Sequence, residues 1–367
     1  MSPSIRFPEF TGEWEKCKIE DITDAVSSGK SKNHFSNGEY NLYGSTGIIG
    51  RTDKALYDGK LVLVARVGAN AGFLQIINEP CGITDNTLIL KPKGIDAFYL
   101  YYFLQHFNLN RLIFGSGQPL ITGGMLKKVK VSLGTISEQS KIVKFLSLLD
   151  ERIATQVRLI DRLQSLIKGI NRTIFTGSGL EYSLCDVCEI RSGYSGNQLQ
   201  GGKGLGVSRI ETISAHNINL ERIGYVAPFD ASENYRLQVG DILFSNINSV
   251  EYIGNTAFID KDYNLYHGMN LLRLIPFRNV VVPFYLYILL NTNRMLKHFK
   301  TICNKAVSQA SINQKELGKT IVMLPSLEKQ KQVCNIYQAM YSKLKTEKDV
   351  LSFYQEQKRY LLRHMFI

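Results

Sequence analysis

Two stretches of the chain carry the same heptad pattern, and this repetition constrains the fold more than any other feature. In residues 136–175 apolar side chains recur in alternating steps of four and three, which is typical of a helix that buries one stripe against another helix. The same pattern returns 191 residues later without a gap, and its single central polar residue, Glu347, is equivalent to Gln156 in the first stretch. The seam positions that we expect to be buried are Ile142, Leu146, Leu149, Ile153, Gln156 and Ile160, then Val333, Leu344, Glu347 and Leu351.

The repetition predicts an internal duplication in which each half ends in a long helix. We expect two mixed α/β domains at residues 1–135 and 178–325, each followed by a helix, at residues 136–177 and 326–367. The predicted fold class is α+β, with the two helices packed as an antiparallel coiled coil around a pseudo-twofold axis. Antiparallel packing would place Gln156 and Glu347 near each other, where a polar pair fixes the register of the seam. Thr135 and Glu138 have capping-box spacing at the start of the first helix, and Gly177 is placed to end it.

Inside the two domains the recognisable segments also repeat. Leu61 to Ala65 has the apolar run of a buried strand, residues 40–50 look like two strands around a glycine turn, and residues 96–108 look helical with aromatic core residues. Residues 239–244 parallel 58–63, residues 284–287 repeat 98–101, and Gln309 matches Gln118 at the same 191-residue offset. Between these segments the domains diverge, which suggests one task performed on two targets.

Composition indicates a polyanionic partner and gives no sign of a membrane or of a disulfide framework. The formal net charge is +12, the isoelectric point is near 9.3, and the excess is spread over both halves, which favours an extended nucleic-acid-binding surface over a basic tail. A merely basic protein is the alternative. With no apolar leader and no run long enough for a bilayer, we expect a cytoplasmic protein. Cys185 and Cys188 form a single Cys-x-x-Cys without a second pair, so packed thiols are favoured over a metal site.

Motifs for catalysis are missing from the sequence. Gly29-Lys30-Ser31 resembles the end of a phosphate-binding loop, but Asp24 stands where that loop needs its first glycine. An amino-methyltransferase would carry an Asn/Asp-Pro-Pro-aromatic motif, and no Pro-Pro dipeptide occurs. We therefore predict a protein without catalysis or metal of its own.

What remains is a set of loop residues of the kinds that bond phosphates and base edges. They recur at matched places in the two repeats, which distinguishes them from ordinary solvated loop residues. The candidate DNA-binding residues of the first domain are Lys30, Lys32, Tyr43, Ser45, Arg66, Asn70, Ser116 and Gln118. Those of the second domain are Tyr194, Gln198, Lys203, Asn217, Asn246, Asn248, Lys305, Ser308 and Gln309.

Several motifs resemble the specificity subunits of type I restriction–modification systems, over nearly the whole chain. They are Arg6-Phe7-Pro8-Glu9-Phe10 with Glu13-Trp14-Glu15, Tyr43-Gly44-Ser45-Thr46-Gly47, Ala65-Arg66-Val67-Gly68-Ala69-Asn70, Ile136-Ser137-Glu138-Gln139 and Leu324-Pro325-Ser326-Leu327-Glu328-Lys329-Gln330. The resemblance implies two target recognition domains, each reading one half of a split site in double-stranded DNA, and two helices that pack antiparallel. Two departures are Gly134 in place of the usual proline and Lys329 where the first repeat has Glu138.

The resemblance also implies the partners. Such a subunit binds no cofactor itself. It docks two methyltransferase (modification) subunits, which use S-adenosylmethionine, and restriction/translocase subunits, which use ATP. The helices would set the spacer between the half-sites. Two other hypotheses stay open on the residues alone: a two-headed protein-interaction scaffold without DNA specificity, which salt-dependent DNA binding would separate, and a DNA-modifying enzyme with unrecognised motifs, which a methyl-transfer assay would separate.

Overall fold

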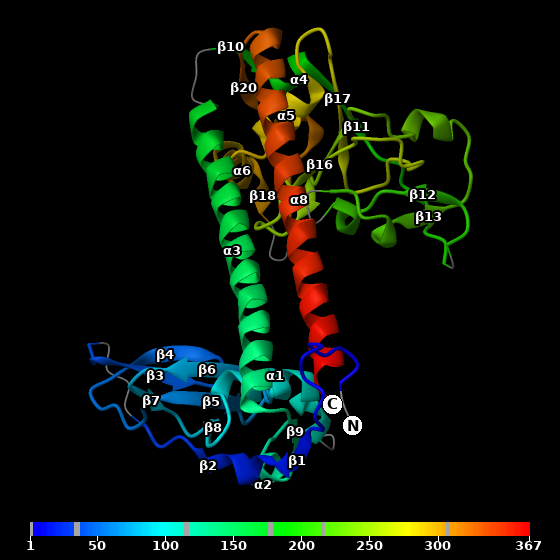
Figure 1. Cartoon of the computed structure of the whole chain (residues 1–367). Coiled ribbons are helices and arrows are strands. Elements are labelled where there is room, and N and C mark those ends of the chain that lie inside the picture. Colours follow the sequence, from blue (N-terminus) through cyan, green and yellow to red (C-terminus); the bar gives the residue numbers. More distant parts are fainter. Residues whose placement is uncertain are drawn as a thin grey trace. The chain divides into compact units, whose positions relative to one another are not determined.

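A computed structural model gives the fold, and it describes residues 3–32, 37–113, 117–174, 179–200, 202–213, 217–305 and 309–367. The chain divides into two compact units (Figure 1). The first comprises Met1–Leu159 with Glu347–Ile367, and the second comprises Ile160–Thr346. Each unit therefore contains one mixed domain and part of each long helix. Among the described residues, no helix is long and apolar enough to cross a membrane.

The central sheets of the two units have the same strand order. Each sheet has four strands, and neighbouring strands are antiparallel. The helix that comes next in the sequence after the sheet's last strand packs against the sheet. In the first unit the order is β2 (Thr23–Ser28), β8 (Thr87–Pro92), β5 (Lys60–Ala65) and β6 (Leu74–Asn78), with α1 (Ala97–Phe107). In the second it is β11 (Cys188–Ser192), β17 (Leu272–Pro276), β14 (Ile242–Phe244) and β16 (Thr256–Phe258), with α5 (Pro283–Leu290). The predicted parallel between residues 58–63 and 239–244 is thus confirmed, since it pairs β5 with β14.

A two-stranded ladder beside the start of each long helix also repeats. In the first unit β1 (Glu15–Lys18) pairs with β9 (Lys130–Leu133), and in the second β10 (Leu180–Ser183) pairs with β20 (Ile321–Leu324). A short helical turn follows the first strand of each ladder, and a short helix precedes the second. These are η1 (Ile19–Ile22) and α2 (Gly123–Lys127), then α4 (Leu184–Val187) and α7 (Gln314–Gly318).

The segments between these shared elements differ, as the sequence predicted. The first unit has a three-stranded sheet and a 3-10 turn after α1: β3 (Tyr40–Gly44), β4 (Gly47–Thr52), β7 (Cys81–Ile83) and η2 (Leu109–Leu112). The second has a β12–β13 pair with several 3-10 turns, a second helix and three short strands. They are β12 (Leu205–Val207), η3 (Ile210–Ile213), η4 (Leu220–Arg222), β13 (Gly224–Val226), η5 (Ser232–Tyr235), α6 (Asn293–Ile302), β15 (Ile247–Asn248), β18 (Asn304–Lys305) and β19 (Ala310–Ser311).

The long helices are α3 (Ile136–Ile174) and α8 (Leu327–Met365). Every predicted seam residue of the two helices is buried or half-buried, as a coiled-coil stripe requires. Within the first unit the two helices run antiparallel, because Gln156 contacts Glu347 while Asp150, earlier in α3, pairs with Lys358, later in α8, at 2.6 Å. Gly177, the predicted helix stop, lies outside the described residues.

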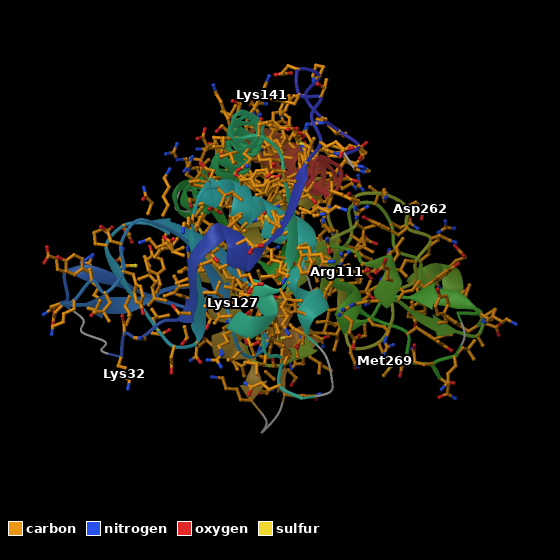
Figure 2. All side chains as sticks on the ribbon, turned by 60° about the horizontal axis from the view of Figure 1, so that its bottom comes forward. Lys32, Arg111, Lys127, Lys141, Asp262 and Met269 are labelled. Carbon is orange, nitrogen blue, oxygen red and sulfur yellow. The ribbon has the colours of Figure 1, made fainter. Side chains whose placement is uncertain are left out.

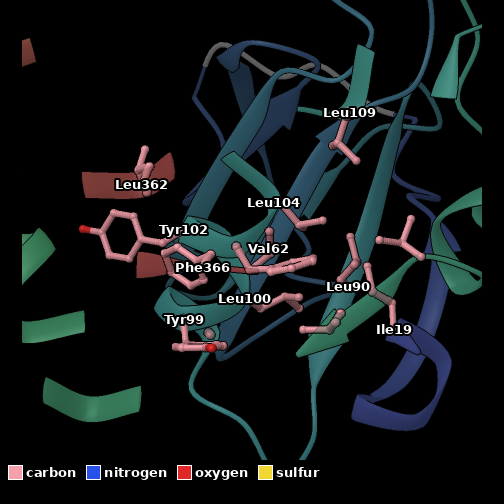
Figure 3. Packing of buried hydrophobic residues seen from close by; sticks show 14 of the residues in the cluster. Ile19, Val62, Leu90, Tyr99, Leu100, Tyr102, Leu104, Leu109, Leu362 and Phe366 are labelled. Atoms are coloured by element: carbon pink, nitrogen blue, oxygen red, sulfur yellow. The ribbon is translucent and has the colours of Figure 1, made fainter. Parts of the chain in front are cut away.

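The core of the first unit joins the sheet, α1 and both long helices (Figure 3). Tyr99, Tyr102 and Phe103 of α1 are buried in it, as their helical spacing predicted. The chain's last residues belong to the same core, since the ring of Phe366 lies 5.3 Å from the ring of Tyr99 and 6.3 Å from that of Phe103. Burying these aromatic side chains anchors the end of α8 to the first domain.

The capping box predicted at the start of α3 is only half formed. Glu138 N–H donates to the Thr135 hydroxyl at 3.3 Å, but the Glu138 side chain does not return to Thr135. Instead Arg6 Nε and Nη2 donate to its two oxygens at 2.6 and 2.9 Å, and Trp14 Nε1 donates at 3.1 Å. A charge-assisted bidentate pair is stronger than one cap hydrogen bond, so the tertiary partner takes the carboxylate. A Cβ at Gly134 would meet Glu138 Oε2 and stand 2.9 Å from Trp14 Nε1, which explains why proline is absent there.

Candidate nucleic-acid interface

In the first unit, two loops that carry predicted DNA contacts lie side by side. The loop after β5 and the segment before α2 are joined by hydrogen bonds from Ile121 N to Arg66 O at 2.8 Å and from Gly68 N to Pro119 O at 3.0 Å. Gly68 has φ 82°, which allows the chain to turn away from the sheet here. These hydrogen bonds bring Arg66, Asn70 and Gln118 onto one pair of loops. Asn70 and Gln118 are exposed.

The second unit builds the same loop pair from different residues. Ile312 N donates to Asn246 O at 2.8 Å, the counterpart of the bond from Ile121 to Arg66. Ladder pairing then places Asn248 and Lys305 each opposite Ala310, next to the exposed Gln309. Four predicted contacts of the second domain therefore meet on one small sheet. We call the two structures the reading loops: residues 66–70 with 117–121, and residues 246–248 with 304–305 and 309–312.

A polar atom without a partner occurs at the same place in both reading loops. Within the described residues, Arg66 Nε and Asn246 Oδ1 are buried and have no hydrogen-bond partner. Buried polar groups are nearly always paired in folded proteins, so unpaired ones need an explanation, such as water or an external ligand. Arg66 and Asn246 themselves are half-buried, so part of each side chain reaches the surface.

The other predicted residues of the first unit lie outside the reading loop. Lys30 and Lys32 are exposed near the end of β2, and Ser45 is half-buried in the turn between β3 and β4. The Tyr43 hydroxyl donates to Glu79 Oε1 at 2.6 Å, and burial with this carboxylate raises the pKa of Tyr43. Tyr43 is thus engaged within the protein. Ser116 lies outside the described residues.

The remaining residues of the second unit are scattered over its divergent part. Tyr194 stacks on Phe229 with ring centroids 3.6 Å apart and an angle of 2° between the rings, so its face is covered. Gln198 forms a bridge with Val226, and Lys203 is exposed just before β12. Asn217 instead lines a cavity of about 390 Å³ beside α5 and α8. Ser308 lies outside the described residues.

The structure adds polar residues that the sequence analysis missed. Asn70 shares a cavity of about 360 Å³ with Gln105, Asn108 and Asn110, which follow or end α1. Arg111 is exposed in the same turn, and Figure 2 labels its side chain and that of Lys127, with Lys32 of the same domain farther away. Asn108, with a left-handed φ of 56°, caps the end of α1. The closely spaced amides Gln105, Asn108 and Asn110 were the signal in the sequence that could have located this polar site.

The cysteines offer little chemistry. Cys185 is exposed, whereas Cys188 is buried, its thiol lies 3.2 Å from Leu184 O, and burial raises its pKa to about 12. A thiol that stays protonated is a poor metal ligand and nucleophile. Among the described residues, no cluster of three or more His, Cys, Asp or Glu side chains could hold a metal ion.

Comparison with known protein families identifies the family to which this duplicated chain belongs. The sequence model of the type I restriction modification DNA specificity domain matches residues 11–165 and again residues 180–352. The chain belongs to this family. The two matches fall on the two repeats, so the predicted duplication, the α+β class and the resemblance to specificity subunits are confirmed together.

Curated members of the family show the same kinship. The chain is 38% identical over 187 residues to the putative type I restriction enzyme MjaX specificity subunit of Methanocaldococcus jannaschii, covering 50% of this chain and 44% of that protein. It is 26% identical over 334 residues to the MjaVIII specificity subunit of the same organism, covering 81% and 74%. A 26% identical match to the EcoprrI specificity subunit of Escherichia coli covers 34% of this chain and 31% of that protein. The chain therefore aligns with less than half the length of two of these relatives.

Solved structures show the same fold. The S subunit of a type I restriction–modification system from M. genitalium superimposes with a TM-score of 0.67 at 19% identity, over 100% of this chain and 99% of that one. A chain from a structural study of assembly and conformational transition of the type I R-M system gives a TM-score of 0.62 at 16% identity, over 96% and 97%.

Proposed function

We propose that this chain is the DNA-recognition subunit of a type I restriction–modification complex and that each domain reads one half of a bipartite site. The observation that carries the proposal is the pair of reading loops. Both are closed by the same backbone hydrogen bond, yet one presents Arg66 and Gln118 and the other Asn246, Lys305 and Gln309. An identical frame with different base-contacting side chains is what two readers of different half-sites require.

The charge of the chain supports a DNA partner. A net charge of +12 favours association with a polyanion, and Arg, Asn and Gln are the side chains that form bidentate contacts with guanine and adenine. We assign base contacts first to the reading-loop residues Arg66, Gln118, Asn246 and Gln309. Lysines such as Lys305 suit phosphate contacts, which set register without reading sequence.

The partner subunits would supply catalysis. The chain itself would bind neither S-adenosylmethionine nor ATP, and the long helices would dock two methyltransferase subunits and, through them, restriction/translocase subunits in the cytoplasm. Support comes from the family relationship and from the missing phosphate-binding and methyltransferase motifs. The purified chain alone should transfer no methyl groups and hydrolyse no ATP. Turnover that survives removal of contaminating subunits would contradict this part of the proposal.

The test uses the complex assembled with its methyltransferase subunits. Methylated positions are mapped across the genome of a host that carries the wild-type chain, and DNA binding is then measured against salt on the sites found. Arg66→Ala and Gln118→Ala should relax or weaken recognition of one half-site, and Asn246→Ala and Gln309→Ala that of the other. Each lost base contact should cost about 1–3 kcal/mol, whereas Lys305→Ala should lower affinity evenly and flatten the salt slope.

Two exposed positions outside the reading loops, Lys91→Ala and Gln238→Ala, serve as matched controls. They should leave the methylated motif and the affinity unchanged. If all five loop variants behave like these controls, the reading loops are the wrong faces. If wild-type complex shows no salt-dependent DNA binding, the protein-interaction scaffold becomes the better hypothesis.

A further inference from the structure

The start of α8 differs from the start of α3 in what covers it. The two starts are otherwise built alike: Gln139 Nε2 donates to Gly134 O at 2.9 Å, and Gln330 Nε2 donates to Pro325 O at 2.9 Å. The ladders beside them have the same register, with Glu15 opposite Leu133 and Leu180 opposite Leu324. Position by position, Trp14 therefore corresponds to Gly179, and Glu138 corresponds to Lys329.

At the first helix start the chain's own N-terminal segment fills the space. Trp14 is 5% exposed and the Glu138 side chain is fully buried beneath it, held by Arg6 and by the indole N–H. Phe7 of the same segment packs edge-on against Phe145 of α3 at 6.0 Å between ring centroids. Residues 3–14 thus form a peptide cover that pairs the Glu138 carboxylate, buries the Trp14 ring and half-buries the Phe7 ring.

At the second helix start, none of the residues that the structure describes covers the corresponding space. A cavity of about 630 Å³ lies there, and Gly179 and Lys329 both line it, where the first repeat has its Trp–Glu contact. The other lining residues are mainly apolar and include Tyr182, Val280 and Leu324. Leu180, also in the lining, is 69% exposed, so its apolar surface is accessible at the cavity.

The linker before β10 is much shorter than the first cover. Only five residues separate the end of α3 at Ile174 from the start of β10 at Leu180, against the twelve residues of the first cover. A second copy of this chain is a poor occupant as well. Its cover carries Arg6, which would face the cation of Lys329, and that arginine is already held by Glu138.

We propose that the cavity at the start of α8, which we call the second cover site, binds a segment of a partner protein that presents an aromatic side chain next to a carboxylate. The carboxylate would pair with Lys329, reversing the Arg6–Glu138 pairing of the first site, and the aromatic ring would pack against the apolar lining at Tyr182 and Val280. A partly desolvated ion pair gives such a site charge selectivity, and the buried ring gives it most of its affinity.

This inference concerns a protein partner and does not depend on which bases the domains read. It also leaves the reading loops untouched, because no residue of the second cover site belongs to them. Loss of DNA recognition and loss of cover-site binding are therefore separately measurable, and either proposal can fail alone.

The experiment uses two peptides as probes and the full-length chain as receptor. One has the sequence of residues 3–14, and the other is the same peptide with Arg6→Glu; binding is followed by fluorescence anisotropy. Wild-type protein should bind the Arg6→Glu peptide about tenfold more tightly than the unchanged one, because only the Arg6→Glu peptide has a carboxylate, and no cation, at the position expected to face Lys329. Lys329→Glu should reverse that preference.

Two further variants separate charge from apolar burial. Lys331→Glu makes the same charge change on an exposed residue of α8 outside the cavity lining, and it should keep the wild-type preference. Leu180→Ser, at a highly exposed position, should weaken both peptides to a similar degree. Equal binding of the two peptides, an unchanged preference in Lys329→Glu, or no saturable binding up to about 1 mM peptide would each overturn the proposal. Displacement of the peptide by duplex DNA alone would assign the site to nucleic acid instead.

Discussion

Gln156 Nε2 donates a hydrogen bond to the main-chain oxygen of Glu347 at 2.9 Å, and a second one to the Glu347 carboxylate. The two residues are equivalent in the duplication, and both are buried at 9% and 7% exposure. The central polar position of each seam therefore forms its hydrogen bonds with the same position of the other helix. A one-turn shift of either helix would break both hydrogen bonds and leave the buried Gln156 amide facing apolar seam residues, so this contact selects the register of the pair.

The first prediction follows from this contact. Gln156→Leu should destabilise the chain by about 1–3 kcal/mol, because Glu347 loses a buried amide donor, and Glu347→Leu by a similar amount, because the buried Gln156 amide loses its acceptors. The double variant should recover most of the loss. Urea denaturation measures all three, with the exposed Glu151→Leu on α3 as control. A double variant as unstable as the sum of the singles would show that the pair is not coupled.

The second prediction concerns a buried ion pair of the second unit. Arg273 Nη2 and Asp241 Oδ2 lie 2.7 Å apart with both side chains at most 5% exposed. In the first unit the matching strand pair, β5 with β8, carries Leu61, Leu63 and Ile89 in an apolar core cluster. Single replacements Asp241→Leu and Arg273→Ile should each cost about 3–5 kcal/mol, while the double replacement should be near neutral or stabilising. Calorimetry of the three variants tests this; a double variant no better than either single would contradict it.

The third prediction compares the same substitution, glycine to alanine, at a crowded position and at an open one. Gly134→Ala would push a methyl group into Glu138 and Trp14, so the Arg6–Glu138–Trp14 contacts should loosen and the melting temperature should fall. Gly169→Ala, inside α3, adds a methyl group with nothing within 4 Å and should stabilise by about 0.5–1 kcal/mol through helix propensity. Both are read by thermal denaturation and by fluorescence of Trp14, the chain's single tryptophan. An unchanged Trp14 emission in Gly134→Ala would speak against the crowding argument.

The fourth prediction is a pH dependence of stability in the second unit. Burial lowers the pKa of His267 to about 4, and its Nε2 lies 3.0 Å from Leu271 O. An unfolded chain has a histidine pKa near 6.5, so between about pH 6.5 and 4 the unfolded state binds the proton and the folded state does not. The contribution to stability is therefore complete above about pH 6.5 and is lost as the pH falls, by at most about 3 kcal/mol.

Replacing His267 isolates that contribution. His267→Gln keeps a donor near Leu271 O but cannot titrate, so the fall in unfolding free energy between about pH 7 and pH 5 should be smaller than in the wild type. Stability at about pH 7.5, where a histidine is neutral in both states, serves as the reference for each protein. Parallel pH profiles for the two proteins would show that His267 is not the responsible group.

The fifth prediction tests the helices as the spacer of the proposed bipartite site. A heptad inserted after Gln156 and a second after Glu347 keep both apolar stripes in phase and add about 10 Å of helix, near three base pairs. The extended complex should prefer a longer spacer while reading the same half-site bases. It should also bind DNA more weakly. Moving the two recognition domains apart along the duplex also requires them to rotate around it, and the extended helices do not supply that rotation. A doubly extended protein that folds, binds and keeps the original spacer would show that the helices do not set it.

Much of this fold is visible in the sequence because it depends on short-range periodicity. The heptad seams located α3 and α8, the apolar run at residues 61–65 located β5, and the glycine turn at residues 40–50 located the hairpin of β3 and β4. The 191-residue offset matched Gln118 to Gln309, and the structure places both on equivalent reading loops. Such signals lie within a few turns or strands, where side-chain spacing alone fixes which face is buried.

Contacts between distant segments were decided by the tertiary structure alone. The sequence spacing assigned Glu138 to a capping box, but Arg6, 132 residues away, takes its carboxylate. The sequence also suggested Tyr43 and Tyr194 as DNA contacts. In the folded chain the Tyr43 hydroxyl donates to Glu79, and the Tyr194 ring stacks on Phe229. Charge pairing and ring burial are settled by which side chains the fold brings within reach, and no local period encodes that. The sequence by itself therefore determined the duplicated frame, and only the folded chain decided which polar groups on that frame remain available to a partner.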